Sequence, residues 1–202
     1  MDIPFLGGAY EGRSKSINAQ RSINMFTIYD PNDAKVVKAM YGTPGTVEFS
    51  DPEYGEYPVR AMTVVGSEMF VVVRDRIFKI STAGVVTYLS SGVDLSTTSG
   101  YVGIANNGTQ VLIVDGTSTG RIVTTSSVTS IGSGDDFPVA VDCVFFDGYF
   151  LVIEKDTGRF QISTIYNGLA WNALDYAVAE SAPDDLIGIG VTLSNYPMKL
   201  RL

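Results

Sequence analysis

The chain has 202 residues, 45% of them hydrophobic and 18% charged, and its 21 glycines suit one large, turn-rich β domain. Its formal net charge of −8 does not suit wrapping of nucleic acid, which requires Lys and Arg to displace phosphate counterions, although an acidic surface could line a passage along which DNA slides. There is no histidine, which removes the commonest general base and the commonest metal ligand.

The single cysteine, Cys143, lies in an apolar run, and we expect a small buried hydrophobic residue rather than a nucleophile. One cysteine cannot form an intrachain disulfide, so a reducing compartment is compatible with the chain. The N-terminus lacks the basic and apolar regions of a signal peptide, and no apolar run approaches the roughly 20 residues that cross a bilayer. We therefore expect no catalytic residue, no cofactor, no metal and no membrane span.

Residues 1–58 show no repeat, and we expect an extended N-terminal arm there. A strand-like stretch over residues 16–29 precedes a turn at residues 30–33. Residues 34–41 could form a short helix or a strand that pairs back across this turn, and we favour the strand. A mild basic cluster in the arm could touch DNA or an acidic partner, or could simply face solvent; it consists of Arg13, Lys15 and Arg21.

From residue 59 onward, one hairpin pattern occurs three times. In its clearest copy, at residues 145–153, two apolar stretches flank Asp147-Gly148, a pair that tolerates the positive φ angles of a type I′ turn. The earlier copies turn at Gly66-Ser67 and at Asn107-Gly108. The marker glycines stand at positions 66, 108 and 148, which are 42 and 40 residues apart. Such periods, with several short strands in each, are typical of β-propeller blades.

The repeats predict an all-β fold: a partial β-propeller-like array of about three and a half four-stranded blades with an extended N-terminal arm. In the first repeat we expect strands at residues 59–65, 68–74, 76–81 and 85–89. Residues 196–202 show no strand pattern. The predicted blades cover residues 59–92, 100–136, 137–181 and, incompletely, 183–202.

The first two strands of each repeat are the most apolar, so we expect them to be sandwiched between neighbouring blades, with the last strand near the rim. Three and a half blades cannot close a ring. Sheet faces and edges would stay open unless other elements, other subunits or a longer product cover them. The strand-like hydrophobic residues of the arm lie outside the repeats, and we expect them to pair with a blade edge, in this chain or in a neighbour.

Chemistry is sparse in this sequence. Carboxylates on loops could serve glycosidase-type catalysis or bind Ca²⁺, but acidic residues also start β-turns and no loop has a calcium-loop spacing. Three aromatic residues near the end of the third repeat could anchor an interface or could pack over an outer strand. The loop carboxylates are at positions 115, 135, 136, 156, 184 and 185, and the aromatic residues are Tyr166, Trp171 and Tyr176.

Four segments, in order along the chain, resemble the packaged-DNA stabilisation proteins of P22-like short-tailed phages, also called tail hub or nozzle proteins. They are SINAQRSINMF at residues 16–26, YGTPG at 41–45, WNALDYAVAES at 171–181 and PDDLIGIG at 183–190. Members of that family are much longer, and the match fades after Leu193.

The resemblance implies a non-enzymatic virion protein of the phage tail, assembled in the host cytoplasm as a six-fold homo-oligomeric ring. Its implied neighbours are the portal or adaptor protein and the tail needle or tailspikes. The ring would extend the channel for double-stranded DNA, without sequence recognition, and would retain the genome until ejection. The alternative function is a carbohydrate- or receptor-binding propeller module. A propeller glycosidase is a third hypothesis, ranked behind both.

Overall fold

The computed structural model describes residues 25–29, 38–179, 185–192 and 199–201, and within these the regular structure is β-strand apart from one 3₁₀ turn at Ser133–Asp135. The chain divides into two compact units, Met1–Glu48 and Phe49–Leu202, which we describe separately. The basic cluster of the arm lies outside the described residues.

The first unit contains one antiparallel hairpin. Strand β1 (Met25–Tyr29) pairs with β2 (Lys38–Gly42) in a register that joins Met25 to Gly42 and Tyr29 to Lys38. The strand that we favoured over a short helix is therefore present. A two-stranded hairpin is at best marginally stable by itself in water, so this one needs a further sheet or a packing surface.

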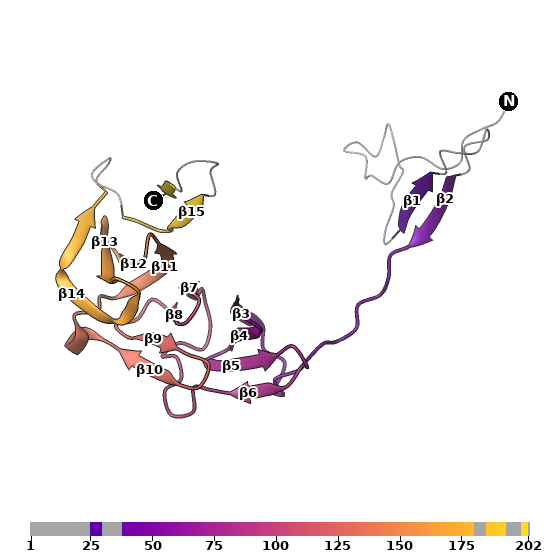
Figure 1. Ribbon diagram of the computed structural model, residues 1–202, viewed down its shortest axis with the longest axis horizontal. Coiled ribbons are helices and arrows are strands. Elements are labelled where there is room, and N and C mark those ends of the chain that lie inside the picture. The colour runs from indigo at the N-terminus through magenta and orange to yellow at the C-terminus, as the bar shows by residue number, and fades with distance from the viewer. Residues whose placement is uncertain (1–24, 30–37, 180–184, 193–198, 202) are drawn as a thin grey trace. The chain divides into compact units, whose positions relative to one another are not determined.

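The second unit contains three four-stranded antiparallel sheets, each a meander in chain order. Blade 1 has a strand pattern close to the predicted one, and the inner strands of the three blades contact one another in turn. Figure 1 shows these inner strands β3, β7 and β11 lying toward one another, with β6, β10 and β14 outermost. The fold is thus the predicted partial propeller. The blades consist of β3 (Val59–Val65), β4 (Glu68–Val73), β5 (Arg76–Ser81) and β6 (Val86–Tyr88); β7 (Gly103–Asn106), β8 (Val111–Val114), β9 (Gly120–Val123) and β10 (Val128–Ile131); and β11 (Ala140–Phe146), β12 (Tyr149–Glu154), β13 (Arg159–Thr164) and β14 (Asn167–Val178).

A fourth blade begins after blade 3. Strand β15 (Gly190–Thr192) pairs with β16 (Lys199–Arg201), and β15 contacts β11 as β11 contacts β7. The expectation that residues 196–202 hold no strand is wrong. A three-residue strand with the sequence Lys-Leu-Arg is too short for an alternating pattern to be visible in the sequence.

The marker turns differ in width. In blade 3, Phe146 pairs with Tyr149, and Asp147 and Gly148 have φ angles of 49° and 86°, as a type I′ turn requires. In blade 2, Asn106 pairs with Val111, which leaves four residues in the turn. There the Asn107 side chain accepts a hydrogen bond of 2.7 Å from the backbone N–H of Gln110 and so organises the wider loop.

Two apolar cores seal the two junctions between blades. Phe70, Val72 and Ile77 of blade 1 pack with Val111 and Ile113 of blade 2. Leu112 and Ile122, on the other face of blade 2, pack with Phe150 and Val152 of blade 3. The second strands β4, β8 and β12 are buried over most of their length, as expected. Of the inner strands, β7 and β11 are buried in part and contribute Ala105 and Cys143 to the core between blades 2 and 3, whereas β3 is largely open. The expectation that both lead strands are sandwiched therefore fails at β3.

A third cluster lies on the face of blade 1 that points away from blade 2, which we call the rear face. Val71, Val73, Phe78 and Ile80 are buried there, although none of the described strands of the second unit forms a preceding sheet over them. Their cover is the segment 49–58, which enters blade 1. The Tyr54 ring lies 6.0 Å from that of Phe78 and its hydroxyl donates to Asp75.

The linkers between blades are held in one recurring way. Arg121 of β9 donates from Nε to the carbonyl of Val93, in the linker that precedes blade 2. Gln161 of β13 donates from Nε2 to the carbonyl of Asp136, in the linker that precedes blade 3.

Phe78 of β5 stands at the same place in blade 1, and there it packs against Tyr54. Phe78, Arg121 and Gln161 are equivalent by register, because they pair with Val71, Ile113 and Val152 of the second strands, which in turn pair with Met62, Ile104 and Cys143 of the inner strands. Segment 49–58 therefore occupies the position of an interblade linker.

Candidate functional site

Trp171, one of the three aromatic residues considered as interface anchors, belongs to the core. Its ring meets Phe137 edge to face at 5.0 Å, and its Nε1–H donates to the Gly168 carbonyl at 2.7 Å. The side chain is 8% exposed. The structure thus agrees with the alternative that Trp171 packs within a blade.

Tyr166 lies at the tip of the turn between β13 and β14 and is 63% exposed. Its φ of 53° is in the left-handed region, and its backbone N–H donates to the Gly148 carbonyl at 2.7 Å. Its ring lies 5.8 Å from Phe145. The marker turn of blade 3 therefore fixes Tyr166, which holds the ring at the surface.

Tyr176 lies near the other end of β14 and carries the Arg159 guanidinium 3.7 Å above its ring. Arg159 also forms an ion pair of 3.3 Å with Glu154. The cation is therefore stacked and neutralised, and the stack stays partly exposed. Sequence spacing gave no sign of this pairing, because Arg159 and Tyr176 meet only through the β13–β14 register.

Along β14 and the turn before it, exposed apolar side chains form a strip that we call the outer strip of blade 3. Leu174, with 79% of its surface exposed, is its most open member, and β14 pairs with β13 on one edge only among the described strands. Exposed apolar surface on a sheet edge of this length is typical of an interaction surface. The strip consists of Ile165, Tyr166, Leu169, Leu174, Tyr176 and Val178.

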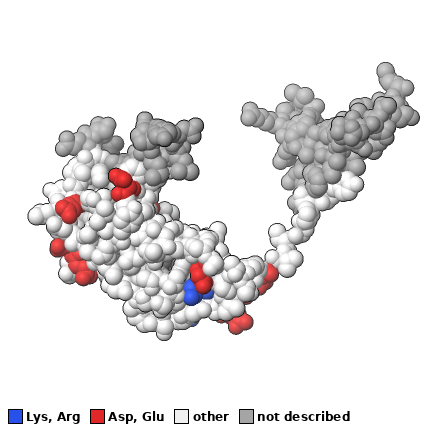
Figure 2. Space-filling model, viewed as in Figure 1, with Lys and Arg blue, Asp and Glu red and all other residues white. Residues whose placement is uncertain are grey.

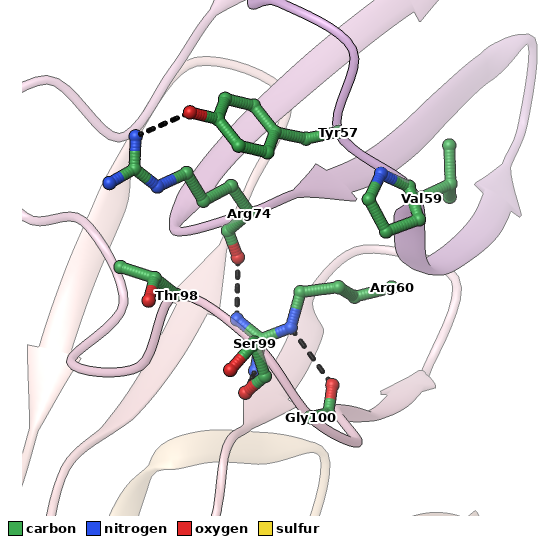
Figure 3. A pocket seen from close by; sticks show the side chains of 8 residues that line it. Tyr57, Val59, Arg60, Arg74, Thr98, Ser99 and Gly100 are labelled. Carbon is green, nitrogen blue, oxygen red and sulfur yellow. Dashed lines mark hydrogen bonds between the residues drawn. The ribbon is translucent and has the colours of Figure 1, made fainter.

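A second candidate is a cavity of about 590 Å³ beside the start of β3, where two guanidinium groups meet the linker between blades 1 and 2. Figure 3 shows the Arg60 guanidinium turned toward Gly100 and the Arg74 carbonyl, while the Arg74 guanidinium reaches the Tyr57 hydroxyl. The cavity is lined by Tyr57, Pro58, Val59, Arg60, Arg74, Thr98, Ser99 and Gly100.

Arg60 is a structural residue in this cavity. All five of its N–H groups donate: Nε to Gly100, Nη1 to the carbonyls of Arg74 and Thr97, and Nη2 to Thr97 Oγ1 and the Ser99 carbonyl. A guanidinium has five donors, so none remains for a ligand. Arg74 stacks on Tyr57 at 4.9 Å, donates to the Tyr57 hydroxyl at 3.3 Å and forms an ion pair of 3.9 Å with Asp75. Thr98 and Ser99 bring hydroxyl groups to the cavity, but its lining residues include no carboxylate or other general base to activate them.

Two of the loop carboxylates, Asp115 and Asp135, form hydrogen bonds that fix a turn or a linker. Asp115 accepts from Thr117 Oγ1 at 2.6 Å and from the backbone N–H and Oγ1 of Thr97 at 3.0 and 2.9 Å. Burial raises the pKa of Asp115, but these hydrogen bonds outweigh it, so its pKa lies below the usual value. Asp135 accepts from the backbone N–H of Gly132, and Asp156 adopts a positive φ of 55° in its turn.

One buried carboxylate, Asp142, joins three segments and was not singled out in the sequence. Its Oδ1 accepts from the Tyr101 hydroxyl at 2.9 Å, and its Oδ2 accepts from the backbone N–H of Ile189 at 3.1 Å. Blade 2, blade 3 and the linker to β15 therefore meet at this side chain. Desolvation of the hydroxyl, and then its bond to Asp142, raise the pKa of Tyr101 to about 12.

Cys143 is buried, as expected, and lies 3.8 Å through Sγ from the Leu112 carbonyl. Burial, and then the neighbouring Asp142, raise its pKa well above that of a free thiol, which disfavours the reactive thiolate.

Across the described parts of the chain, no group of three or more His, Cys, Asp or Glu side chains is placed to hold a metal ion. In the same parts, no helix is long and apolar enough to cross a membrane. Figure 2 shows acidic side chains spread over the visible face and basic ones at one place.

A family model described as bacteriophage P22 Gp10, β-propeller, matches residues 1–197. No curated protein matches the chain. Among solved structures, the WD40 domain of Pan2 from Neurospora crassa is similar with a TM-score of 0.38 and 12% identity over 55% of this chain. The matched region spans about a third of the Pan2 chain, 35% of its length.

Proposed function

The chain belongs to the phage stabilisation family of bacteriophage P22 Gp10 β-propeller proteins, and from this premise we propose that it is a tail hub or nozzle subunit of the head–tail junction. In that role it extends the DNA channel below the portal or its adaptor, retains the packaged genome and takes part in ejection. The match over residues 1–197 is the observation that carries this proposal.

The surface chemistry supports a passage for DNA rather than a DNA-binding site. The net charge of −8 disfavours stable contact with phosphates, so DNA could slide past such a surface. Arg60 and Arg121, two arginines of the blades, donate their N–H groups to backbone carbonyls of the linkers. Recognition of a sequence would instead need free donors at base edges.

A structural role without catalysis agrees with the two candidate sites. The cavity at Arg60 holds no general base beside a nucleophile, and the carboxylates of Asp115 and Asp135 are engaged in hydrogen bonds that fix turns. The outer strip of blade 3 offers Tyr166 and Tyr176 as contacts for a neighbouring subunit, a tailspike or a needle protein.

The proposal is tested in the particle. Phage carrying a nonsense codon early in the gene should package DNA in a non-suppressing host and then lose it, so that the encapsidated DNA becomes sensitive to added nuclease. Supplying the intact chain from a plasmid should restore nuclease resistance. Particles that lack the chain and still keep full-length, nuclease-resistant DNA would refute a role in genome retention.

Assembly is tested separately with purified components. The chain should co-elute with its portal or adaptor protein in size-exclusion chromatography. Replacing Leu174 and Tyr176 by Ser should weaken contacts made through the outer strip, while Trp171 fluorescence reports that blade 3 is still folded. An unchanged set of contacts for this double variant would remove the strip from the proposed interface.

A further inference from the structure

We propose that the Arg159–Tyr176 stack on the outer strip of blade 3 is a docking site for a tyrosine side chain on an extended, basic segment of a partner protein. In blade 1 an equivalent stack is already covered by a tyrosine of this chain, and that contact is the template for the inference. The proposal rests on the proposed function only in placing a partner at the outer strip, and it is independent of the role in genome retention.

The arginine–tyrosine stack recurs at one position of the blade. Phe78 and Gln161, which are equivalent by register, pair with Tyr88 and Tyr176 of the outermost strands. Two residues earlier in the third strand, both blades have an arginine. Its guanidinium lies 4.9 Å from the ring of Tyr88 in blade 1 and 3.7 Å from the ring of Tyr176 in blade 3. These arginines are Arg76 and Arg159.

In blade 1 a second tyrosine covers the stack. Arg76 also lies over the ring of Tyr54, at 3.8 Å, so its guanidinium contacts two tyrosine rings. The Tyr54 hydroxyl donates at 2.9 Å to Asp75, in the turn between the second and third strands. A tyrosine on an extended segment therefore makes a cation–π contact and a hydrogen bond at one place on the blade.

In blade 3 the same groups are present without the covering tyrosine. Among the residues that the structure describes, Tyr176 is the only ring over which Arg159 lies. The Arg159 side chain is 36% exposed and Tyr176 is 46% exposed, so a ring from outside can reach them. The turn between the second and third strands again carries an aspartate, Asp156, and it is exposed.

The ion pair between Arg159 and Glu154 is compatible with this contact. The two side chains meet through Arg159 Nε and Glu154 Oε2 at 3.3 Å. A guanidinium is planar and its N–H groups point outward in that plane, whereas aromatic rings stack on its faces. The carboxylate and an incoming ring therefore use different parts of Arg159.

The surroundings of the stack determine the charge of the partner. Exposed carboxylates lie in β14 beside Tyr176, in the turn before Arg159 and in the linker whose carbonyl Gln161 binds. Figure 2 shows acidic side chains and no basic ones over blade 3 on the visible face. Lys or Arg residues next to the docking tyrosine would complement this surface. The carboxylates are Asp175, Asp156, Asp135 and Asp136.

Segment 49–58 shows the backbone form of such a ligand but has the wrong charge for blade 3. It carries Asp51, Glu53 and Glu56 and no Lys or Arg, and its Tyr54 is already engaged at blade 1. The occupant of the blade 3 site is therefore a segment that resembles residues 49–58 in its tyrosine and extended backbone and differs from them in being basic.

The first test uses a labelled ten-residue peptide with the sequence of residues 49–58 in which Asp51, Glu53 and Glu56 are replaced by Lys. Fluorescence anisotropy with excess full-length chain measures its binding. The same peptide with Tyr54→Leu should bind about three- to tenfold more weakly, because it lacks the ring that stacks on Arg159. The unchanged acidic sequence should also bind more weakly than the basic peptide.

The second test changes the chain. Tyr176→Leu keeps apolar surface but removes the ring, and it should weaken binding of the basic peptide about three- to tenfold. Tyr88→Leu is the matched control, because it alters the equivalent stack of blade 1, which Tyr54 already covers, and it should leave binding unchanged. Trp171 fluorescence should be the same in both variants, which shows that blade 3 is folded.

Three outcomes would overturn the docking site: a basic peptide that does not bind, equal binding of its Tyr54→Leu version, or unchanged binding by the Tyr176→Leu chain. Equal losses for Tyr88→Leu and Tyr176→Leu would also overturn it, because the stack of blade 3 would then have no special part. Nuclease resistance of the particle is a separate measurement, so failure of the docking site and failure of genome retention are distinguishable.

Discussion

The junctions between blades and the rear face of blade 1 are made from the same kind of strand but differ in how far their side chains are buried. At the junction of blades 2 and 3, Phe150 and Leu112 are fully buried against each other's sheets. At the rear face, Met62 and Val64 remain in water while a ten-residue linker covers the second and third strands, β4 and β5. The difference teaches that a blade's second strand is buried by its own linker and neighbours, whereas its inner strand needs a complete neighbouring sheet.

The largest expected effect is the difference in the free energy of unfolding between a substitution in a blade junction and one on the rear face. Phe150→Ala leaves a cavity in a sealed junction and should lower the free energy of unfolding by about 3–5 kcal/mol. Met62→Ala, on the open face, should change it by about 0.5 kcal/mol or less, because the side chain is already exposed. Urea titrations of monomeric protein followed by Trp171 fluorescence measure both. Equal losses would mean that the rear face is as well packed as the junction.

Arg60 lies between the rear face and the junction of blades 1 and 2, because its hydrogen bonds join the start of β3 to the linker that enters blade 2. Arg60→Ala leaves several carbonyl groups without a donor and should cost about 1–3 kcal/mol. Arg74→Ala is the matched control, because that side chain is partly exposed and its loss should cost about 0.5 kcal/mol or less. If both variants unfold at the same urea concentration, Arg60 does not fasten the linker.

The turn glycines provide a smaller comparison. Gly66 borders the open face and Gly148 the covered side of blade 3, and both have positive φ angles. Alanine should cost about 1–2 kcal/mol at either position because L residues disfavour that conformation. At Gly148 the new methyl would also approach the Tyr166 ring at 3.2 Å, whereas nothing lies within 4 Å at Gly66. In urea denaturation, Gly148→Ala should therefore have a lower free energy of unfolding than Gly66→Ala. The reverse order would contradict the packing of Tyr166.

The smallest effect appears at high pH. The pKa of Tyr101 is raised to about 12 in the folded chain, from about 10 in an unfolded one, so its contribution to stability is complete below pH 10 and is lost as the pH rises through 12. Tyr101→Phe lacks this titration, so the urea midpoint of the variant should fall less between pH 9 and 11.5. Parallel declines for both proteins would show that the Tyr101–Asp142 bond does not stabilise the junction.

Much of the fold could be predicted because blades repeat strongly at the level of strands and turns. The strands of blade 1 and the strand at residues 159–164 follow from β-branched and aromatic runs between turn residues. The type I′ turn at Asp147-Gly148 follows from its two residues alone. These features are local, so the sequence displays them directly.

The side chains that bind the interblade linkers could not be predicted, because the same position of the blade holds an aromatic, a cationic or an amide residue. Phe78, Arg121 and Gln161 share a register and a task but share no property that a sequence repeat would reveal. Trp171 was ambiguous for a related reason: its burial depends on Phe137, which arrives from another strand connection. Asp142 became visible only when Tyr101 and Ile189 were brought to it by the packing of blades.

The fastening of segment 49–58 has a mechanical consequence. A pull on the chain at Phe49 is transmitted to the Gly84 turn through Ser50 and to the Asp75 turn through Tyr54, on the outer part of blade 1. The load therefore bypasses β3, whose ladder with β4 would otherwise be peeled one hydrogen bond at a time. Tension on residues 1–48 is thereby isolated from the strand that stands innermost in the propeller.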